Sequence, residues 1–220
     1  KSQLKGEQEI LLQLIKLQQD NSAGFWFRNM LSEAVSLSGE IRAEAGLNTE
    51  NYNAADVIFY DLNKRMAPRM PFEVIVLGTG KIAQLIARSK PPEAKINFAA
   101  HKNYLKAAAL AEYSGGEAFF LKDLPQIILK ADAVVSAVKS PHYILKKSHF
   151  LNAAGKREKK LYVYDLSAPR GIDPQIKDLE NVFLQDADDL KDVFSYFNDL
   201  NKTSLAYAAE LIEANLCQLQ

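Results

Sequence analysis

The sequence has one cysteine, no long apolar run and no excess of either charge. The single thiol, Cys217, excludes an intramolecular disulfide and fits a reducing cytoplasm, where we expect this protein to act. No apolar run is long enough to cross a bilayer and no secretory signal is present, so we expect no membrane association. Lys plus Arg and Asp plus Glu both number 27, which argues against a broad sequence-independent grip on nucleic acid but leaves a local patch open.

An initiator methionine is also lacking. The chain begins at Lys1 inside a helical pattern, so we expect it to be a piece of something longer. Hydrophobic residues make up 48% of the 220 residues, which is enough for one large domain or for a domain with a helical appendage.

What the sequence does contain is a short apolar strand followed at once by a glycine turn. Residues 74–77 form a mostly β-branched run, typical of a parallel strand that is covered on both faces. Gly78 and Gly80 follow, and Ala83 takes the place of the third small residue of a dinucleotide fingerprint. The glycines allow a tight turn and close approach of a pyrophosphate, which would face the N–H groups opening a helix over 81–89. A plain sheet-to-helix turn is the alternative interpretation.

Helical patterns precede this motif, and strands alternate with helices after it. The early helices are predicted over 1–20, 25–45 and 51–64. Strands are predicted over 73–77, 95–99, 117–121, 133–137, 161–165 and 182–184, with helices over 81–89, 103–113, 123–130 and 145–153. The alternation predicts an α/β fold, a Rossmann-like doubly wound parallel sheet with its crevice at the carboxyl ends of the first and fourth strands.

One long amphipathic helix is predicted after Asp186-Ala187-Asp188-Asp189, a cluster suited to an N-cap and a first helical turn. The chain is therefore divided into a helical segment at 1–66, a Rossmann-like domain at 67–185 and a long connecting helix at 186–220.

The residues after the second strand bear on the choice of cofactor. An acidic residue about 20 positions after the fingerprint would bind the ribose 2′-hydroxyl of NAD. Here His101 and Lys102 follow the strand, and two potential cations suit a phosphate-bearing ribose better. We therefore expect NADP(H), with two solvated surface residues as the alternative.

Two more loops follow strands at the same edge of the predicted sheet. The fourth strand ends at Ser136, and small polar residues at such a strand end commonly contact phosphate or ribose. The fifth strand leads into residues 165–174, where Arg170 either holds a carboxylate or phosphate or forms an ion pair with Asp165 or Asp173.

We assign no catalytic residue and no metal ligand. His142 is a lone loop histidine, and Cys217 lies on the terminal helix without a nearby base. The predicted cofactor contacts are Gly78, Thr79, Gly80, Lys81, Ile82, His101, Lys102, Ser136, Ala137, Val138, Ser167, Ala168 and Pro169.

With these motifs in view, the sequence resembles the glutamyl-tRNA reductase family over nearly its whole length. The most telling blocks are SAVKSP at 136–141 (family S-S-T-x-S-P) and DLSAPRGIDP at 165–174 (family D-I-A-V-P-R-D-I-x-P). Further blocks are GEQEILLQLIK at 6–16, IRAEAG at 41–46, VLGTGK at 76–81 and QDADDL at 185–190. Ordered blocks at matching separations are far more specific than any one of them.

The resemblance implies a two-step reaction that starts tetrapyrrole (porphyrin) synthesis. In that family a cysteine within a T-C-N-R-x-E block attacks the glutamyl ester of charged tRNA, and NADPH then reduces the thioester to glutamate-1-semialdehyde. The resemblance also implies glutamyl-tRNA as substrate, a homodimer formed through the C-terminal helical region, and glutamate-1-semialdehyde aminomutase as a candidate partner.

The departures from the family matter as much. This sequence has no T-C-N-R block, so we expect the chain by itself to lack the nucleophile and to form no thioester. The family's A-N-R-T after the second strand is here Ala99-Ala100-His101-Lys102, without the arginine expected to hold the 2′-phosphate. Lys139 replaces a small polar residue in the loop after the fourth strand.

Three interpretations follow. The first is the NADPH-binding part of a glutamyl-tRNA reductase, and the second is a non-catalytic relative that binds a nucleotide or a partner. The third is another dehydrogenase of the precorrin-2 type, which would need its own acid and a tetrapyrrole pocket that the sequence does not indicate.

Overall fold

The computed structural model describes residues 4–19, 24–47, 52–66, 71–154 and 159–218, without the side chains of residues 9, 151–154 and 217–218. The chain forms two compact units, residues 1–53 with 192–220, and residues 54–191. Residues 54–66 and 186–191 thus group with the sheet, whereas the sequence-based division placed them in the flanking helical segments.

Residues 54–191 are built around a six-stranded sheet in which all neighbouring strands are parallel. The strands are β1 Phe72–Leu77, β2 Ala94–Ala100, β3 Ala118–Phe120, β4 Ala133–Ser136, β5 Leu161–Asp165 and β6 Val182–Asp186. Their order is β3-β2-β1-β4-β5-β6, which places the topological switch point between β1 and β4. The predicted fold class and all six predicted strands are confirmed.

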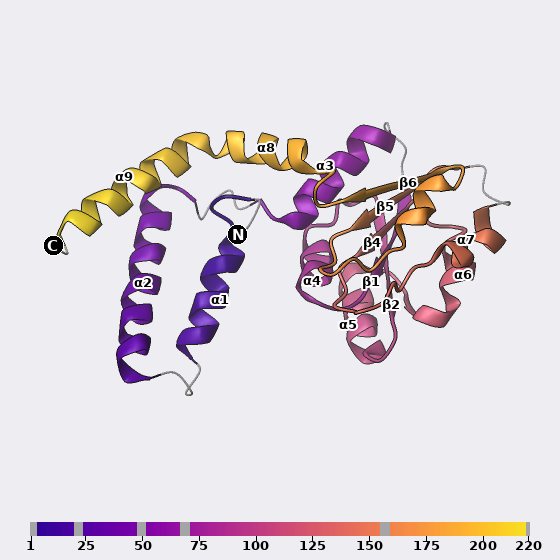
Figure 1. Ribbon diagram of the computed structural model, residues 1–220, viewed down its shortest axis with the longest axis horizontal. Coiled ribbons are helices and arrows are strands. Elements are labelled where there is room, and N and C mark those ends of the chain that lie inside the picture. Colours follow the sequence, from indigo (N-terminus) through magenta and orange to yellow (C-terminus); the bar gives the residue numbers. More distant parts are fainter. Residues whose placement is uncertain (1–3, 20–23, 48–51, 67–70, 155–158, 219–220) are drawn as a thin grey trace. The chain divides into compact units, whose positions relative to one another are not determined.

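Helices lie on both faces of this sheet (Figure 1). They are α3 Ala54–Met66, α4 Lys81–Arg88, α5 Tyr104–Ser114, α6 Leu124–Ile127 and α7 Lys147–Ala154, with 3-10 turns η1 Leu121–Asp123 and η2 Pro174–Asp178. Ile75 and Leu77 of β1 join Phe150 of α7 in the core on one face, while Val74 and Val76 are fully buried on the other. Burial on both faces explains why β1 reads as a continuous apolar run instead of an alternation.

Residues 1–53 with 192–220 form the helical unit. Its helices are α1 Gln8–Gln18, α2 Phe25–Glu44, α8 Lys191–Leu200 and α9 Lys202–Gln218, the first residue of α8 belonging to the sheet unit. α1 and α9 both contact α2, and the core of this unit comprises Ile41, Ala45, Leu47 and Ala208.

The C-terminal segment differs from the single long helix predicted for it. Asn201 separates α8 from α9, and its carbonyl accepts the backbone N–H of Leu205 (2.8 Å). Asn is a favoured residue at the start of a helix, so Asn201 begins a second helix where the apolar pattern alone predicts continuity. No helix in the described part of the chain is long and apolar enough to cross a membrane.

Candidate functional site

The carboxyl ends of β1, β2 and β4 converge on the glycine turn. Leu77 of β1 lies opposite Ala99 of β2 and Ser136 of β4. The N–H of Gly78 donates to the Ala99 carbonyl (2.9 Å). Gly78 has φ +100°, and a Cβ there would lie 2.9 Å from Cγ1 of Val138, so this position requires glycine for both backbone and space.

The packing that requires glycine at position 78 is not found at Gly80. Its φ of −76° is open to any residue, and an added Cβ would meet only the Ala137 carbonyl oxygen at 3.8 Å. Packing within the protein therefore does not explain this glycine. A side chain there would instead cover the turn, so Gly80 keeps the surface open to close approach of a ligand.

The turn leads directly into α4, whose first residues are Lys81 and Ile82. Gly80 occupies the N-cap position and, lacking a side chain, makes no capping hydrogen bond, and its carbonyl accepts the N–H of Gln84 (3.1 Å). An uncapped helix start beside an open glycine fits a pyrophosphate, because backbone N–H groups and the helix dipole both favour an anion there.

His101 and Lys102 lie just beyond the end of β2, and both are exposed. A cavity of about 330 Å³ lies between α4 and α5 and reaches the turn at Thr79. Its lining comprises Thr79, Gln84, Arg88, Lys106, Ala109, Leu110 and Tyr113. Lys106 lies in the first turn of α5 and lines the cavity together with Thr79, so the edge next to Thr79 carries more positive charge than His101 and Lys102 alone.

The loop after β4 is fastened to the loop after β5 by hydroxyl groups. Ser136 Oγ and Ser167 Oγ lie 3.0 Å apart, and Ser167 Oγ also accepts the N–H of Val138 (3.2 Å). Ser136 is fully buried, so in this arrangement its hydroxyl shapes the crevice wall and leaves ligand contacts to neighbouring groups. Ala137 is half-buried beside the glycine turn, and Ala168 and Pro169 are exposed beyond Ser167.

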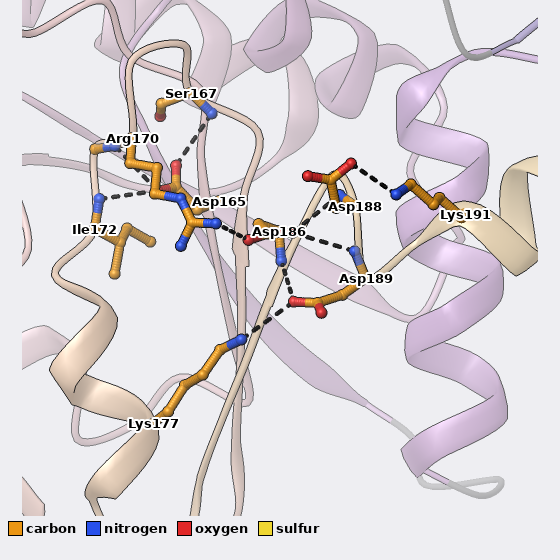
Figure 2. Close-up of polar contacts among 10 residues, drawn as sticks. Asp165, Ser167, Arg170, Ile172, Lys177, Asp186, Asp188, Asp189 and Lys191 are labelled. Atoms are coloured by element: carbon orange, nitrogen blue, oxygen red, sulfur yellow. Dashed lines mark hydrogen bonds and ion pairs between the residues drawn. The ribbon is translucent and has the colours of Figure 1, made fainter.

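Asp165, at the end of β5, organises the loop that follows it (Figure 2). Its Oδ1 accepts the N–H of Ser167 (3.1 Å), and its Oδ2 accepts those of Gly171 and Ile172 (3.0 Å each). Of the two alternatives for Arg170, a ligand contact or an ion pair with Asp165 or Asp173, the ion pair with these partners is not the one that the structure shows. Arg170 forms its ion pair with Asp186 at the end of the neighbouring strand, because the Asp165 carboxylate is already occupied by backbone donors.

The acidic cluster Asp186-Ala187-Asp188-Asp189 was predicted to form an N-cap and a first helical turn, but in the structure it ends β6 and forms a turn that precedes the helix. Asp186 Oδ1 accepts the N–H groups of Asp188 (2.9 Å) and Asp189 (3.1 Å), and α8 begins only at Lys191 (Figure 2). Lys177 forms an ion pair with Asp189 (3.4 Å), and Lys191 forms one with Asp188 (3.2 Å). The hydrogen bond from the Asp186 N–H and then the charge of Lys177 hold the pKa of Asp189 below its ordinary value.

A buried polar cluster that the sequence analysis missed joins α3 to the sheet. Asp61 accepts hydrogen bonds from Tyr164 (2.9 Å) and Arg65 (2.7 Å), and the amide of Gln185, with its O and N exchanged, bridges Asp61 and Arg65. Burial, and then the charge of Asp61, raise the pKa of Tyr164 far above its ordinary value. Burial alone would lower the pKa of Arg65, but Asp61 outweighs it and the pKa is raised.

The structure thus places the predicted cofactor contacts at one edge of the sheet, in the loops after β1, β2, β4 and β5. His142 is exposed in the loop after β4, and the side chain of Cys217 lies outside the described residues. Sequence reasoning missed Lys106 and Arg88. The available signal for Lys106 was its closeness along the chain to His101 and Lys102. In the described part of the chain no group of three or more His, Cys, Asp or Glu side chains is placed to hold a metal ion.

Comparison with known proteins gives consistent matches. The sequence profile of the family described as Shikimate / quinate 5-dehydrogenase matches residues 61–193. The chain is 35% identical over 164 residues to the glutamyl-tRNA reductase of Thermus thermophilus, covering 73% of this chain and 40% of that protein. It is 30% identical over 202 residues to the glutamyl-tRNA reductase of Bacillus subtilis, covering 87% and 44%.

A solved structure supports the same fold. The chain is similar to glutamyl-tRNA reductase from Methanopyrus kandleri with a TM-score of 0.62 and 23% identity, covering 97% of this chain and 55% of that one. The chain spans about half the length of the curated relatives that it matches.

Proposed function

The chain belongs to the shikimate / quinate 5-dehydrogenase family and is a relative of the glutamyl-tRNA reductases over about half of their length, and on this premise we propose that it binds NADPH for the reduction of glutamyl-tRNA. When bound, NADPH supplies the hydride that converts a glutamyl thioester to glutamate-1-semialdehyde, with the thiolate as leaving group. The residues of this chain bind and orient the cofactor.

Gly80 is the observation that carries this proposal. It stands at the carboxyl edge of the switch point, at the start of an uncapped helix, with no nearby atom that requires glycine. A glycine that the protein's own packing does not need is best explained by a ligand that approaches its Cα closely. In this fold, a pyrophosphate at that place is held by the N–H groups opening α4.

The charge beside the turn supports NADPH over NADH. Lys102 and His101 follow β2, Lys106 lies in the first turn of α5, and no acidic residue stands among them in the sequence. A 2′-phosphate there would gain favourable Coulomb and hydrogen-bond interactions, whereas an NAD ribose prefers a carboxylate acceptor.

The loops after β4 and β5 provide the other wall of the crevice. The Ser136–Ser167 contact and the Val138 N–H bond fix the two loops against each other, so the groups facing the crevice are held in one arrangement. Preorganised walls of this kind position a bound group with little loss of conformational entropy on binding.

The test is titration of the purified chain with NADPH and with NADH, followed by nucleotide fluorescence or calorimetry. We expect tighter binding of NADPH, and a weakening for Lys102→Ala and Lys106→Ala that is larger for NADPH than for NADH. Lys130→Ala, which removes an exposed lysine from the turn before β4, at the opposite edge of the sheet, is the matched control. Equal affinities for the two nucleotides, or no effect of either lysine, would contradict the assignment of NADPH.

A non-catalytic nucleotide-binding module is the second candidate, because this sequence contains no T-C-N-R block. Under the main proposal the nucleophile, the tRNA contacts, the homodimer and any contact with an aminomutase belong to the complete protein. We expect the 220-residue chain to bind NADPH but to release no glutamate-1-semialdehyde from charged tRNA. Supplying a catalytic domain with its cysteine should restore the product if the chain is part of a reductase, and should leave it absent if the module is non-catalytic.

A further inference from the structure

A second concave site lies at the opposite edge of the sheet, at the amino ends of β5 and β6. This cavity of about 340 Å³ is lined by Arg65, Lys160, Tyr162, Asn181, Val182 and Phe183. β5 runs from Leu161 to Asp165, so the cavity and the cofactor crevice are separated along the strand by roughly 13 Å. Its volume is within the range of small-molecule sites.

Aromatic and guanidinium planes form one wall of this cavity. The Phe183 and Tyr162 rings meet edge to face with centroids 6.1 Å apart, and the guanidinium carbon of Arg65 lies 4.4 Å from the Phe183 centroid. Phe183 remains 40% exposed, although it is a large apolar side chain on a strand. Exposed aromatic rings and arginine planes are the surfaces on which nucleic-acid bases stack.

The same wall is held rigid from behind. Arg65 donates to the buried carboxylate of Asp61 (2.7 Å), and the Tyr162 hydroxyl donates to the Arg65 carbonyl (3.2 Å). Asp61 already holds the guanidinium group of Arg65 in one orientation. Little further side-chain entropy is therefore lost when a ligand binds against its plane.

Positive charge gathers at the rim. Lys159 and Lys160 directly precede β5, and Lys64 precedes Arg65 on the last turn of α3. The acidic residues nearest in sequence are Glu158, which directly precedes Lys159, the exposed Glu180, and Asp61, which is buried and hydrogen-bonded to Arg65 and Tyr164. The basic residues Lys64, Arg65, Lys159 and Lys160 outnumber these three. A local cationic rim in a chain without net charge favours an anionic ligand at this place.

We propose that this cavity binds a nucleotide, either free or as a residue of an RNA strand, with its base against Phe183 and Tyr162 and its phosphate near Lys160. Stacking and charge are thus supplied by different residues, which allows them to be tested separately. The site involves none of the residues of the cofactor crevice. The proposal can therefore be confirmed or contradicted whether or not the chain binds NADPH.

The test uses the full 220-residue chain in saturating 2′,5′-ADP, so that the probe does not occupy an adenosine site in the crevice. Guanosine 5′-monophosphate is titrated by calorimetry, and a fluorescein-labelled single-stranded RNA of roughly ten nucleotides by anisotropy. Binding of both probes indicates a mononucleotide pocket, and binding of the RNA alone indicates a strand site. Either outcome supports the proposal, and binding of neither overturns it.

Variants then assign binding to this cavity. Phe183→Leu keeps an apolar side chain but removes the ring, and should weaken binding about 5- to 100-fold, the range expected for loss of one base–aromatic stack. Phe183→Tyr should retain it. Lys160→Gln should lower the slope of log affinity against log salt by about one, whereas Lys202→Gln, at an exposed lysine of the helical unit, should not.

Circular dichroism melts establish that each variant is folded. Binding that is unchanged in both Phe183→Leu and Lys160→Gln places the ligand elsewhere and overturns the proposal. This readout does not depend on the cofactor, because a chain that fails to bind NADPH still reports on the cavity through Phe183.

Discussion

The two glycines of the turn after β1 serve different purposes, and alanine distinguishes them. Gly78→Ala forces a side chain into a left-handed conformation and against Val138, so we expect a loss of about 1–3 kcal/mol in the free energy of unfolding. Gly80→Ala meets no such obstacle and should leave stability unchanged or raise it slightly. It should nevertheless weaken NADPH binding by roughly tenfold or more, because the added Cβ covers the approach of the pyrophosphate.

Urea unfolding and NADPH titration of the same two variants test this contrast. Retained affinity in a stable Gly80→Ala protein would contradict the placement of the pyrophosphate at this turn. Equal destabilisation by the two substitutions would contradict the packing argument.

Tyr164 connects a single side chain to the pH dependence of stability. Its hydroxyl is buried against Asp61, which raises its pKa above that of an unfolded tyrosine, about 10. Above that pH the unfolded chain releases this proton while the folded chain retains it, so stability falls as pH rises, by up to about 1.4 kcal/mol per pH unit.

Tyr164→Phe removes this contribution. The wild type should be the more stable at about pH 8, since the variant leaves Asp61 short of a donor, and the difference should shrink towards about pH 11. Urea unfolding of both proteins across this range is the measurement. A constant difference would show that Tyr164 does not titrate between the two states as described.

The loop after β5 depends on one carboxylate. Asp165 accepts three backbone N–H groups, and an amide in its place would present an NH₂ group to donors. We expect Asp165→Asn to cost about 2–3 kcal/mol and to weaken NADPH binding by displacing Ser167. Asp178→Asn, which removes one exposed ion pair with Lys147, is the matched control and should cost less than about 1 kcal/mol. Similar losses in both variants would contradict the role assigned to Asp165.

At the scale of elements, the features that could be predicted from the sequence are those that depend on the pattern of neighbouring residues. The β-branched run at residues 74–77 and the glycines after it predicted strand, turn and helix, because each choice depends on neighbouring residues only. The Asp61–Tyr164 bond joins residues 103 positions apart, and the partner of Arg170 depends on which strands are neighbours. Such pairings follow from the sheet order, so the local pattern carried no sign of them.

At the scale of the whole molecule, the two units differ in how much apolar surface they bury. The sheet unit has residues such as Val134, Leu161 and Phe150 at 0–1% exposure, whereas the core cluster of the helical unit consists of Ile41, Ala45, Leu47 and Ala208 at 5–7%. Short helices gain most of their stability from packing. We therefore expect the amides of α1, α2 and α9 to exchange with solvent faster than those of β1 and β4.

Hydrogen exchange followed by mass spectrometry tests this with one truncation in each unit. Ile41→Ala should lower protection in α2 and α9 while leaving β1 and β4 unchanged, since truncation of a core isoleucine costs about 2–4 kcal/mol only where the cavity is formed. Val134→Ala should lower protection in β1 and β4. If either substitution lowered protection in both units to the same degree, the chain would unfold as one cooperative body. The two cores would then not unfold independently of each other.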